Sequence, residues 1–304
     1  MRFCIGRAAG VQRRNGCLIR ALACVYDDTR SGEATPLGHS DAMIGAITGD
    51  IIGSVHEFAN NERDDFPLFV ERSSPTDDSL LTWTVAEACR DRAQNYRPYL
   101  VKAVQVASRP TNRARLGPAW GAGFSSWVAG GGKGNRESYG NGAAMRVSPV
   151  AWFHHDEAEV LRQAELSALP SHAHPEGVKG AQCTALAAWV ARMTKDPEAV
   201  RKVGERFYGA LPSLDEIRKN HRYNETCQGC VPECVAIAAG TRSFEEAVRF
   251  ACSIRGDADT LGAIVGGISE GLWGVPKDIS ESARAIAEHA YPGMGEVWEW
   301  GGGE

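Results

Sequence analysis

Three short acidic segments, widely separated in the chain, carry side chains suited to binding metal ions. They run from Asp50 to Glu57, from Thr76 to Ser79 through two adjacent aspartates, and from Asp257 to Thr260. A carboxylate near the start of a helix is favoured by the helix dipole, so capping explains one acid in each segment. Capping does not explain a second acid, and carboxylate and hydroxyl oxygens are the ligands that hard divalent cations such as Mg²⁺ prefer. The sequence therefore indicates a metal site, with ordinary helix capping as the alternative.

The composition is that of a globular protein whose charge is unevenly distributed. The chain has 304 residues, of which 43% are hydrophobic and 23% are charged, enough for one large domain or two ordinary ones. Residues 1–40 hold six arginines against three acids, so the rest of the chain is more acidic than the overall net charge of −5. An acidic body argues against broad nucleic-acid binding, because phosphate contacts need clustered cations.

Cysteine content and apolar patterning bear on the compartment. Nine cysteines, an odd number scattered along the chain, argue against a disulfide scaffold. No uncharged apolar stretch approaches the roughly 20 residues that span a bilayer. Arg20 also interrupts the one run, 17–26, that could pass for a signal-peptide core. We therefore expect a cytoplasmic protein with no membrane partner.

Helices are the elements expected to position the acidic side chains. In 76–94, Leu81, Val85 and Cys89 recur on one face while acidic and amide side chains lie opposite. Segment 178–193 is apolar almost all round, as in a helix buried within a bundle. Further helices are predicted at 157–168, 197–208, 244–253, 261–272 and 280–289. Clear period-two alternation is hard to find, so the sequence predicts an all-α fold.

The domain organisation follows from where this helical pattern begins. Residues 1–40 show no sustained periodicity and are interpreted as an N-terminal extension, followed by one domain without internal repeats at 41–304. A glycine-rich region at 117–142 interrupts the helical pattern. An irregular loop of that length inside a domain is usually functional or disordered.

Five motifs follow one another along the domain: residues 49–53 with Glu57, Thr76-Asp77-Asp78, 138–146, 171–177 and 256–260. In this order they resemble the ADP-ribosylglycohydrolase family, and the resemblance extends from residue 43 to residue 276. It implies a compact, single-domain all-α fold with a binuclear Mg²⁺ centre. It also implies a hydrolase that removes ADP-ribose from a modified protein side chain, for which we expect an arginine linkage.

The resemblance also implies roles for individual residues. One Mg²⁺ ion would be held by Thr76, Asp77, Asp78 and Asp259, and the other by Glu57, Asp257, Asp259 and Thr260. Asp259 would bridge the two ions, and the ions would offset the mutual repulsion of the carboxylates. The expected catalytic residues are Glu57, Asp77 and Asp78, with either aspartate as the base and Glu57 as a mobile ligand or an acid.

Substrate binding is expected at the motif 138–146. Its glycines allow the backbone to approach a diphosphate closely, and the following helix offers free N–H donors. By resemblance, the residues that contact ADP-ribose are Ser138, Gly140, Asn141, Gly142, Met145 and His172. The alternative for this segment is a glycine-containing turn before a core helix.

The chain departs from the family pattern at one position of the last motif. Members of the family often have two glycines before Asp-x-Asp-Thr, whereas this chain has Arg255-Gly256. A bulky cation there leaves every predicted ligand in place. It could alter the conformation of the loop or the choice of substrate.

Two further segments resemble ligand-binding motifs but lack features that those motifs require. Residues 130–134 suggest a phosphate loop, but no hydroxyl residue follows Lys133 and no strand precedes it. Three cysteines between Cys227 and Cys234, with His221 upstream, imitate a zinc site. Their spacing is irregular, and Pro232 with the apolar run beyond it suggests a helix start instead.

The arginine-rich extension motivates a second functional hypothesis. A cationic arm at 1–40 could enter the cleft of an ADP-ribosyltransferase toxin, which would make the chain an immunity-type protein that occludes its partner, with or without hydrolysis. A misassigned start codon or an organelle-targeting peptide would also produce such an extension.

Overall fold

The computed structural model describes residues 43–57, 59, 61–114 and 120–300. The chain divides into two units, 1–38 and 39–304, and every described residue belongs to the second. The predicted N-terminal extension therefore lies outside the described residues, so it stays a prediction together with the partner-occluding arm. Among the described helices, none is both long enough and apolar enough to cross a membrane.

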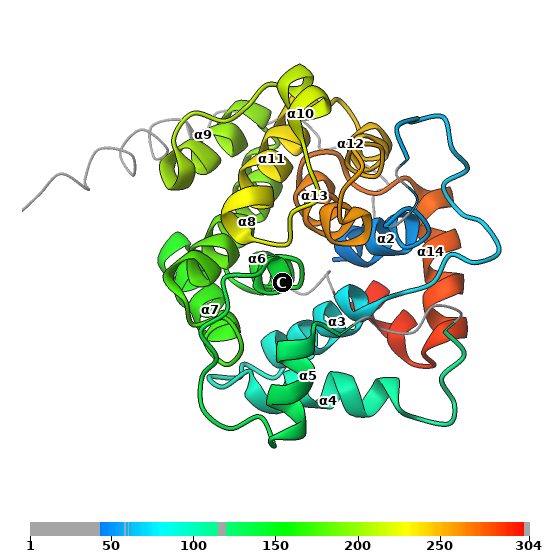
Figure 1. The fold of residues 1–304 in the computed structure, drawn as a ribbon, viewed down its shortest axis with the longest axis vertical. Helices are drawn as coiled ribbons and strands as arrows, with labels where there is room; N and C mark the ends of the chain where they lie inside the picture. Colours follow the sequence, from blue (N-terminus) through cyan, green and yellow to red (C-terminus); the bar gives the residue numbers. More distant parts are fainter. Residues whose placement is uncertain (1–42, 58, 60, 115–119, 301–304) are drawn as a thin grey trace, which may run out of the picture. The chain divides into compact units, whose positions relative to one another are not determined.

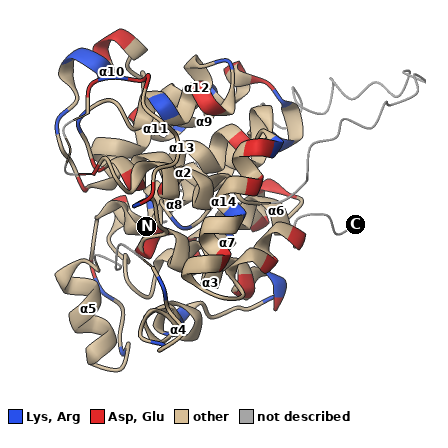
Figure 2. Ribbon diagram, turned by 90° about the vertical axis from the view of Figure 1, so that its right-hand side faces the viewer, with Lys and Arg blue, Asp and Glu red and all other residues tan. Residues whose placement is uncertain are grey.

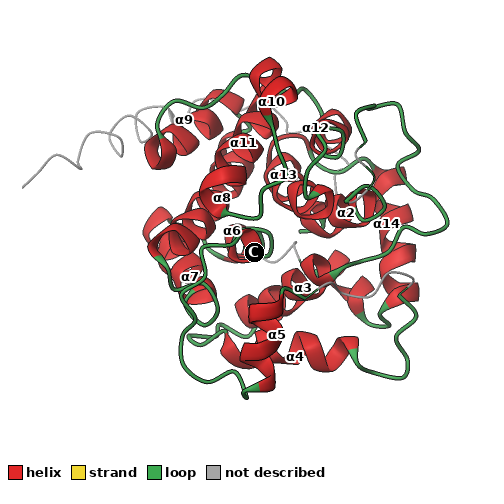
Figure 3. Ribbon diagram, viewed as in Figure 1, coloured by secondary structure: helices red, strands yellow, loops and turns green. Residues whose placement is uncertain are grey.

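Helices make up the regular structure of the described residues, which confirms the all-α prediction (Figure 3). Apart from an isolated bridge between Gly140 and Thr226, these residues form no β-structure. In chain order the elements are α2 (Gly45–Gly53), α3 (Asp77–Arg90), α4 (Arg97–Ala107), α5 (Ala122–Ala129), η1 (Asn141–Ala143), α6 (Val150–Phe153), α7 (Glu157–Ala168), α8 (Pro175–Thr194), α9 (Pro197–Tyr208), α10 (Leu214–Asn220), α11 (Cys227–Gly240), α12 (Phe244–Ala251), α13 (Ala258–Trp273), α14 (Lys277–Ala290) and η2 (Met294–Glu299).

The predicted helix ends are most accurate where a side chain caps the first turn. Helices α7 and α9 have the predicted bounds, because Asp156 accepts a hydrogen bond from the Glu159 amide and Asp196 accepts one from the Glu198 amide. The other predicted helices are present with ends shifted by a few residues. Helices α4 and α10 lie in segments for which the sequence predicts none.

The prediction of one irregular region at 117–142 is wrong, because α5 lies within it. Trp120, Phe124 and Trp127 are spaced as on one helix face, and the Phe124 ring lies 5.4 Å from that of Trp120 and 5.6 Å from that of Trp127. Burial of Phe124 and Trp127 stabilises a helix that the neighbouring glycines conceal in the sequence.

The helix start predicted at Pro232 is also wrong, since α11 begins five residues earlier at Cys227. The Thr226 side chain caps it by accepting a hydrogen bond from the Gly229 amide at 3.2 Å. Pro232 therefore lies inside the helix, where it has no N–H to donate to the preceding turn. The capped start and the buried apolar residues beyond it outweigh that loss.

Helix α13 is the central element of the domain, and it contacts α2, α8, α11 and α12 (Figure 1). Its contact with α2 is closest, because glycines recur at every fourth position on both helices: 45, 49 and 53 on α2, and 262 and 266 on α13. A Cβ placed on Gly49 would lie 1.9 Å from the carbonyl oxygen of Gly262. The two backbones are therefore in direct contact. Asp50 follows Gly49, and Gly53 packs against the backbone of Ala258 and Asp259, so the two aspartates lie at the same end of the helix pair.

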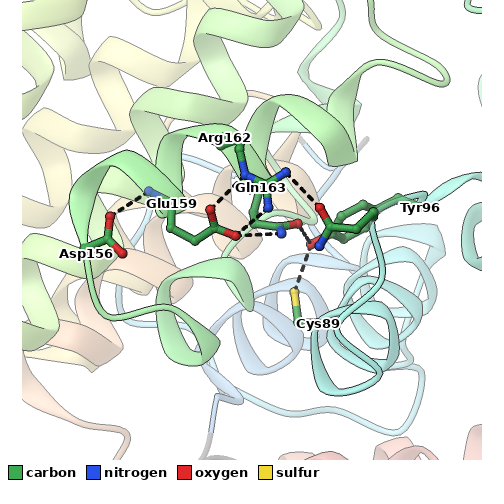
Figure 4. A network of polar contacts seen from close by, with 7 residues as sticks. Cys89, Tyr96, Asp156, Glu159, Arg162 and Gln163 are labelled. Carbon is green, nitrogen blue, oxygen red and sulfur yellow. Dashed lines mark hydrogen bonds and ion pairs between the residues drawn. The ribbon is translucent and has the colours of Figure 1, made fainter.

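A set of polar contacts joins α3, α7 and the segment between α3 and α4 (Figure 4). The Tyr96 hydroxyl donates to Oε1 of Gln163 at 2.9 Å and lies 3.4 Å from the Cys89 sulfur. Gln163 in turn donates to Glu159, which also accepts from Arg162. Each of these groups has a partner, so this buried tyrosine crosslinks helices and leaves no polar atom available for chemistry.

Charged residues are distributed according to helix polarity on many of the surface helices (Figure 2). In α10, for example, acidic side chains occupy the first turn and basic ones the last. This arrangement complements the helix dipole. Another group of acids lies in the cavity described next.

Candidate functional site

A cavity of about 310 Å³ opens between the starts of α3 and α13 and the segment that precedes α6. All the predicted site residues except Thr76 line it: Glu57, Asp77, Asp78, Ser138, Gly140, Asn141, Gly142, Met145, His172, Asp257, Asp259 and Thr260. Residues from five distant motifs thus surround one space.

The start of α3 is fixed by Thr76 and Asp50. Thr76 is the N-cap residue, and its hydroxyl accepts a hydrogen bond from the Asp78 amide at 3.3 Å. The same hydroxyl donates to Oδ1 of Asp50 at 2.8 Å, while Oδ2 of Asp50 accepts from the amides of Thr76 and Ser79 and from the Ser79 hydroxyl. The residue that caps α3 is therefore Thr76 and not one of the two adjacent aspartates. Asp77 and Asp78 follow in the first turn, at the cavity.

The start of α13 is arranged differently. Asp257 occupies the N-cap position, but its side chain caps no amide of the helix. Its Oδ2 accepts instead from Nδ2 of Asn141 at 2.7 Å. Asp259, two residues on, accepts from the adjacent Thr260 amide at 2.9 Å. Both residues line the cavity, so their carboxylates are available to a ligand there.

Two groups of three carboxylates could each hold a metal ion, and Asp259 belongs to both. One comprises Asp50, Asp78 and Asp259, and the other Glu57, Asp257 and Asp259; within each group the ligand atoms lie within 4.8 Å of one another. Oδ1 of Asp78 is buried and has no hydrogen-bond partner. A buried carboxylate oxygen without a donor is costly, and a divalent cation would satisfy it.

Burial and mutual repulsion raise the pKa values of four acids in these groups. Burial, with Asp259 next in importance, raises the pKa of Glu57 to about 8 and that of Asp50 to about 7. The same two causes raise the pKa of Asp78 and that of Asp257 well above the usual range for aspartate. A cation bound among these groups would stabilise their ionised forms and reverse the shifts.

The first carboxylate group includes one acid for which the sequence predicted no role. Asp50, which lies in the first recognised motif but has no role predicted from the sequence, is in the first carboxylate group. Asp77, a predicted ligand of the same ion, lines the cavity but belongs to neither carboxylate group. Thr76, the other predicted ligand of that ion, donates its hydroxyl hydrogen to Asp50, and the roles of both as metal ligands stay predictions. The sequence feature that could have indicated Asp50 is its position beside Gly49. A glycine that allows two helix backbones to touch also brings its neighbouring residues close to the partner helix.

The predicted diphosphate segment is held by α11 and the residues just before it. The Asn141 amide donates to the Glu225 carbonyl at 2.7 Å, and the Cys227 amide donates to the Tyr139 carbonyl at 3.0 Å. Nearby, the Ser138 hydroxyl accepts from the Gly140 amide at 3.2 Å. A Cβ on Gly142 would lie 3.1 Å from the His172 ring, so a side chain at 142 would crowd the imidazole.

The cavity also contains residues that the sequence did not predict. Arg136 lines it, with its guanidinium so close to Gly123 that any side chain there would overlap it. Tyr223 and Glu225 line the cavity as well, and the Tyr223 hydroxyl donates to Oε1 of Glu225 at 2.7 Å. These three residues lie outside every recognisable motif, so no sequence pattern pointed to them.

The departure at Arg255 has a structural basis. Arg255 adopts a left-handed backbone conformation with φ 63°, which glycine adopts more easily. Its guanidinium pairs with Glu62 at 2.5 Å, and both side chains are more than half exposed. Gly256 is required by packing, because a Cβ there would lie 2.5 Å from Nε2 of His221. Arg255 is therefore not among the residues that line the cavity and instead contacts the segment that follows Glu57.

The glycine-rich segment 130–134 and the cysteine cluster, which were rejected as binding motifs from the sequence, have structural contacts. Arg97 donates to the carbonyl oxygens of Gly132 and Gly134, so a guanidinium holds the glycine-rich turn. Nδ1 of His221 lies 2.5 Å from Glu233, and the cysteines at 227, 230 and 234 are buried within α11.

The chain is similar to known proteins in both sequence and fold. A sequence model of the ADP-ribosylglycohydrolase family matches residues 40–289 of the chain. The fold is similar to that of a solved structure described as an ADP-ribosylglycohydrolase-related protein complex, with a TM-score of 0.64 and 21% sequence identity. That match covers 86% of this chain and 95% of the other.

Proposed function

The chain belongs to the ADP-ribosylglycohydrolase family, and from this premise we propose that it is a Mg²⁺-dependent hydrolase that releases ADP-ribose from a modified arginine side chain of a protein. The observation that carries the proposal is the position of Asp259. Its carboxylate belongs to both groups of acids, as a ligand shared by two ions must. Two cations there would neutralise carboxylates that otherwise repel one another.

The acidic groups fit divalent cations better than they fit the alternative of helix capping. Thr76 already caps α3, and Asp257 caps no amide of α13. The unpartnered Oδ1 of Asp78 points most directly to a cation. Bound Mg²⁺ would polarise a water molecule and orient the hydroxyl groups of the ribose.

The residues of the chain would then handle substrate and protons. The segment 138–145, with its close glycines, would bind the diphosphate, and Arg136 would add a positive charge beside it. Glu57, only partly buried at the cavity, is placed to give a proton to the leaving nitrogen. Asp77 and Asp78 remain the candidates for accepting the proton of the attacking water.

The arginine linkage is supported by the acidic and aromatic residues that line the cavity. Tyr223 is 47% exposed, and its ring together with the carboxylate of Glu225 offers a face and a charge to a guanidinium group. A serine acceptor has no cationic group, so neither Tyr223 nor Glu225 would add to its binding affinity. Glu225 and Tyr223 therefore favour arginine as the acceptor.

The test compares ADP-ribose release from matched arginine-linked and serine-linked peptides, in Mg²⁺ and in excess chelator. We expect release from the arginine-linked peptide in Mg²⁺, its loss in chelator, and recovery when Mg²⁺ is restored. Release at an undiminished rate in chelator would contradict the metal requirement. Faster release from the serine-linked peptide would contradict the linkage.

The variant Glu225→Gln tests the acceptor site separately. It should raise KM for the arginine-linked peptide about five-fold, the effect of one partly exposed charged contact, and leave the affinity for free ADP-ribose unchanged. Glu205→Gln, which alters an exposed acid on α9, is the matched control. An equal effect of both variants would show that only the net charge matters.

A further inference from the structure

We propose that Ser171 and Arg146 lock the His172 imidazole as a neutral ring whose Nε2–H points into the cavity, so that His172 donates a hydrogen bond to an anionic oxygen of the substrate and does not transfer protons. The identity of that substrate as ADP-ribose rests on the proposed function. Ser171 and Arg146 are positioning residues in this scheme, because they act through His172.

Arg146 is a buried cation with a fixed set of acceptors. It is 0% exposed, and its guanidinium donates to the carbonyl oxygens of Gly142 at 2.8 Å and Ser167 at 3.0 Å. A third bond, from Nη2 to the Ser171 hydroxyl, measures 2.8 Å. A guanidinium can only donate, so the Ser171 oxygen is the acceptor in this contact.

The Ser171 hydroxyl therefore keeps its own hydrogen for another partner. Its oxygen lies 2.8 Å from Nδ1 of His172, and no other acceptor for this hydroxyl is found among the described residues. Ser171 is fully buried, and a buried hydroxyl hydrogen without an acceptor is costly. The hydrogen must point at Nδ1, which places the ring proton of a neutral His172 on Nε2.

The surroundings also oppose a charged imidazole. Burial lowers the pKa of His172 well below its usual value, and the positive charges of Arg146 and Arg136 lower it further. A proton on Nδ1 would in addition face the hydrogen of Ser171. His172 thus remains neutral near pH 7, unlike a histidine that acts as an acid or base.

The Nε2 edge of the ring lies at the turn that lines the cavity. Built Cβ atoms on Gly142 and Gly140 would lie 3.1 and 3.7 Å from Nε2. Both glycines and His172 line the cavity. A fixed neutral donor beside two glycines suits a diphosphate oxygen, with Arg136 supplying the charge.

The first experiment reads the tautomer directly in the unaltered protein. Long-range ¹H–¹⁵N spectra of protein labelled at histidine, with His172 assigned through His172→Gln, should show a neutral ring protonated at Nε2 from pH 6 to pH 8. A ring protonated at Nδ1, or a charged ring at pH 7, would overturn the proposal. This measurement needs no ligand, so it is valid even if ADP-ribose fails to bind.

The second experiment is a double-mutant cycle on ADP-ribose affinity, measured by calorimetry. Ser171→Ala should weaken binding about ten-fold, because the donor is no longer held in place. His172→Gln keeps an amide donor near the Nε2 position and should retain most of the affinity. In that background Ser171→Ala should have no further effect, whereas an equal loss in both backgrounds would refute a role through His172.

Ser167→Ala is the matched control for this cycle. Ser167 is buried beside Arg146, and its hydroxyl donates to the Ala164 carbonyl rather than to His172. ADP-ribose affinity should be unchanged in this variant. A ten-fold loss there would mean that Ser171→Ala acts by disturbing the packing. If the wild-type protein binds no ADP-ribose at all, the proposed function fails, while the spectra still decide the tautomer.

Discussion

The two ends of the α2–α13 helix pair both bury carboxylates, but only at one end does every carboxylate oxygen have a donor. At the far end, Oε1 of Glu270 accepts from the Ile44 amide at 2.9 Å and Oε2 from the Gly45 amide at 2.8 Å. These amides belong to the start of α2, where no helical acceptor exists. Glu270 thus completes the helix. At the near end, Asp257 and Asp259 lie beside other acids, and Asp78 keeps an oxygen without a partner.

This contrast shows which observation identifies a metal site. Burial raises the pKa of Glu270 to about 8, the same as that of Glu57, so a raised pKa does not distinguish the two ends. What distinguishes them is the number of carboxylates and whether each oxygen has a donor. One carboxylate paired with two amides is a structural contact, whereas five carboxylates close together, with Oδ1 of Asp78 lacking a donor, favour a cation.

The largest effect is expected for Asp259→Ala, which removes the ligand shared by both groups. Hydrolysis should fall by about four orders of magnitude, because neither ion keeps a full set of ligands. The measurement is kcat for ADP-ribose release in saturating Mg²⁺. Glu270→Gln, at the other end of the same helix, should retain kcat well below its melting temperature. Comparable losses of kcat in both variants would mean that the two ends are not functionally distinct.

The next largest effect is expected where the two helices touch. Gly49→Ala should lower the free energy of unfolding by roughly 3 kcal/mol or more, since its Cβ would meet the Gly262 carbonyl and the backbones would have to separate. Urea denaturation measures the loss. Gly121→Ala is the control, because a Cβ there meets nothing within 4 Å. Equal stability of the two variants would show that the helix contact is not tight.

A smaller effect is expected from pH in the metal-free protein. Glu57 and Asp50 have folded-state pKa values above those of the unfolded chain, so the stability they contribute is present at low pH and is lost as the pH rises through about 7 and 8. The free energy of unfolding in chelator should fall by about 2 kcal/mol between pH 6 and pH 8. Mg²⁺ binds the ionised acids and should reduce the decline. An identical decline with and without Mg²⁺ would contradict metal binding at these acids.

The smallest effect is expected for Glu270→Gln on stability. Glutamine offers one acceptor to two amides, so one amide at the start of α2 is left unpaired at a cost of about 1 kcal/mol. Thermal unfolding with and without Mg²⁺ measures it. The cost should be the same in both conditions, because Glu270 contributes nothing to the acidic groups. A cost that appears only in Mg²⁺ would link the two ends of the helix pair.

Much of the fold could be predicted because its signals are local. Asp156 and Asp196 cap α7 and α9 within one turn of their own positions, so both helices have the bounds predicted for them. Helix α5 was missed because its signal, the face formed by Trp120, Phe124 and Trp127, lies among glycines that favour an irregular chain. Motif order in turn predicted which residues surround the cavity, since their chemistry is encoded in residue type and short spacing.

The sequence by itself determined the helical class, the acidic residues at the cavity and the resemblance to one family. Only the tertiary structure decided that Asp50 joins Asp78 and Asp259, that Arg136, Tyr223 and Glu225 line the same space, and that the Ser171 hydroxyl lies against Nδ1 of His172. The physical reason is that these relations depend on contacts between segments far apart in the chain. The contact between Gly49 and Gly262 fixes the relative positions of Asp50 and Asp259. No local sequence pattern predicts which helix a glycine will contact.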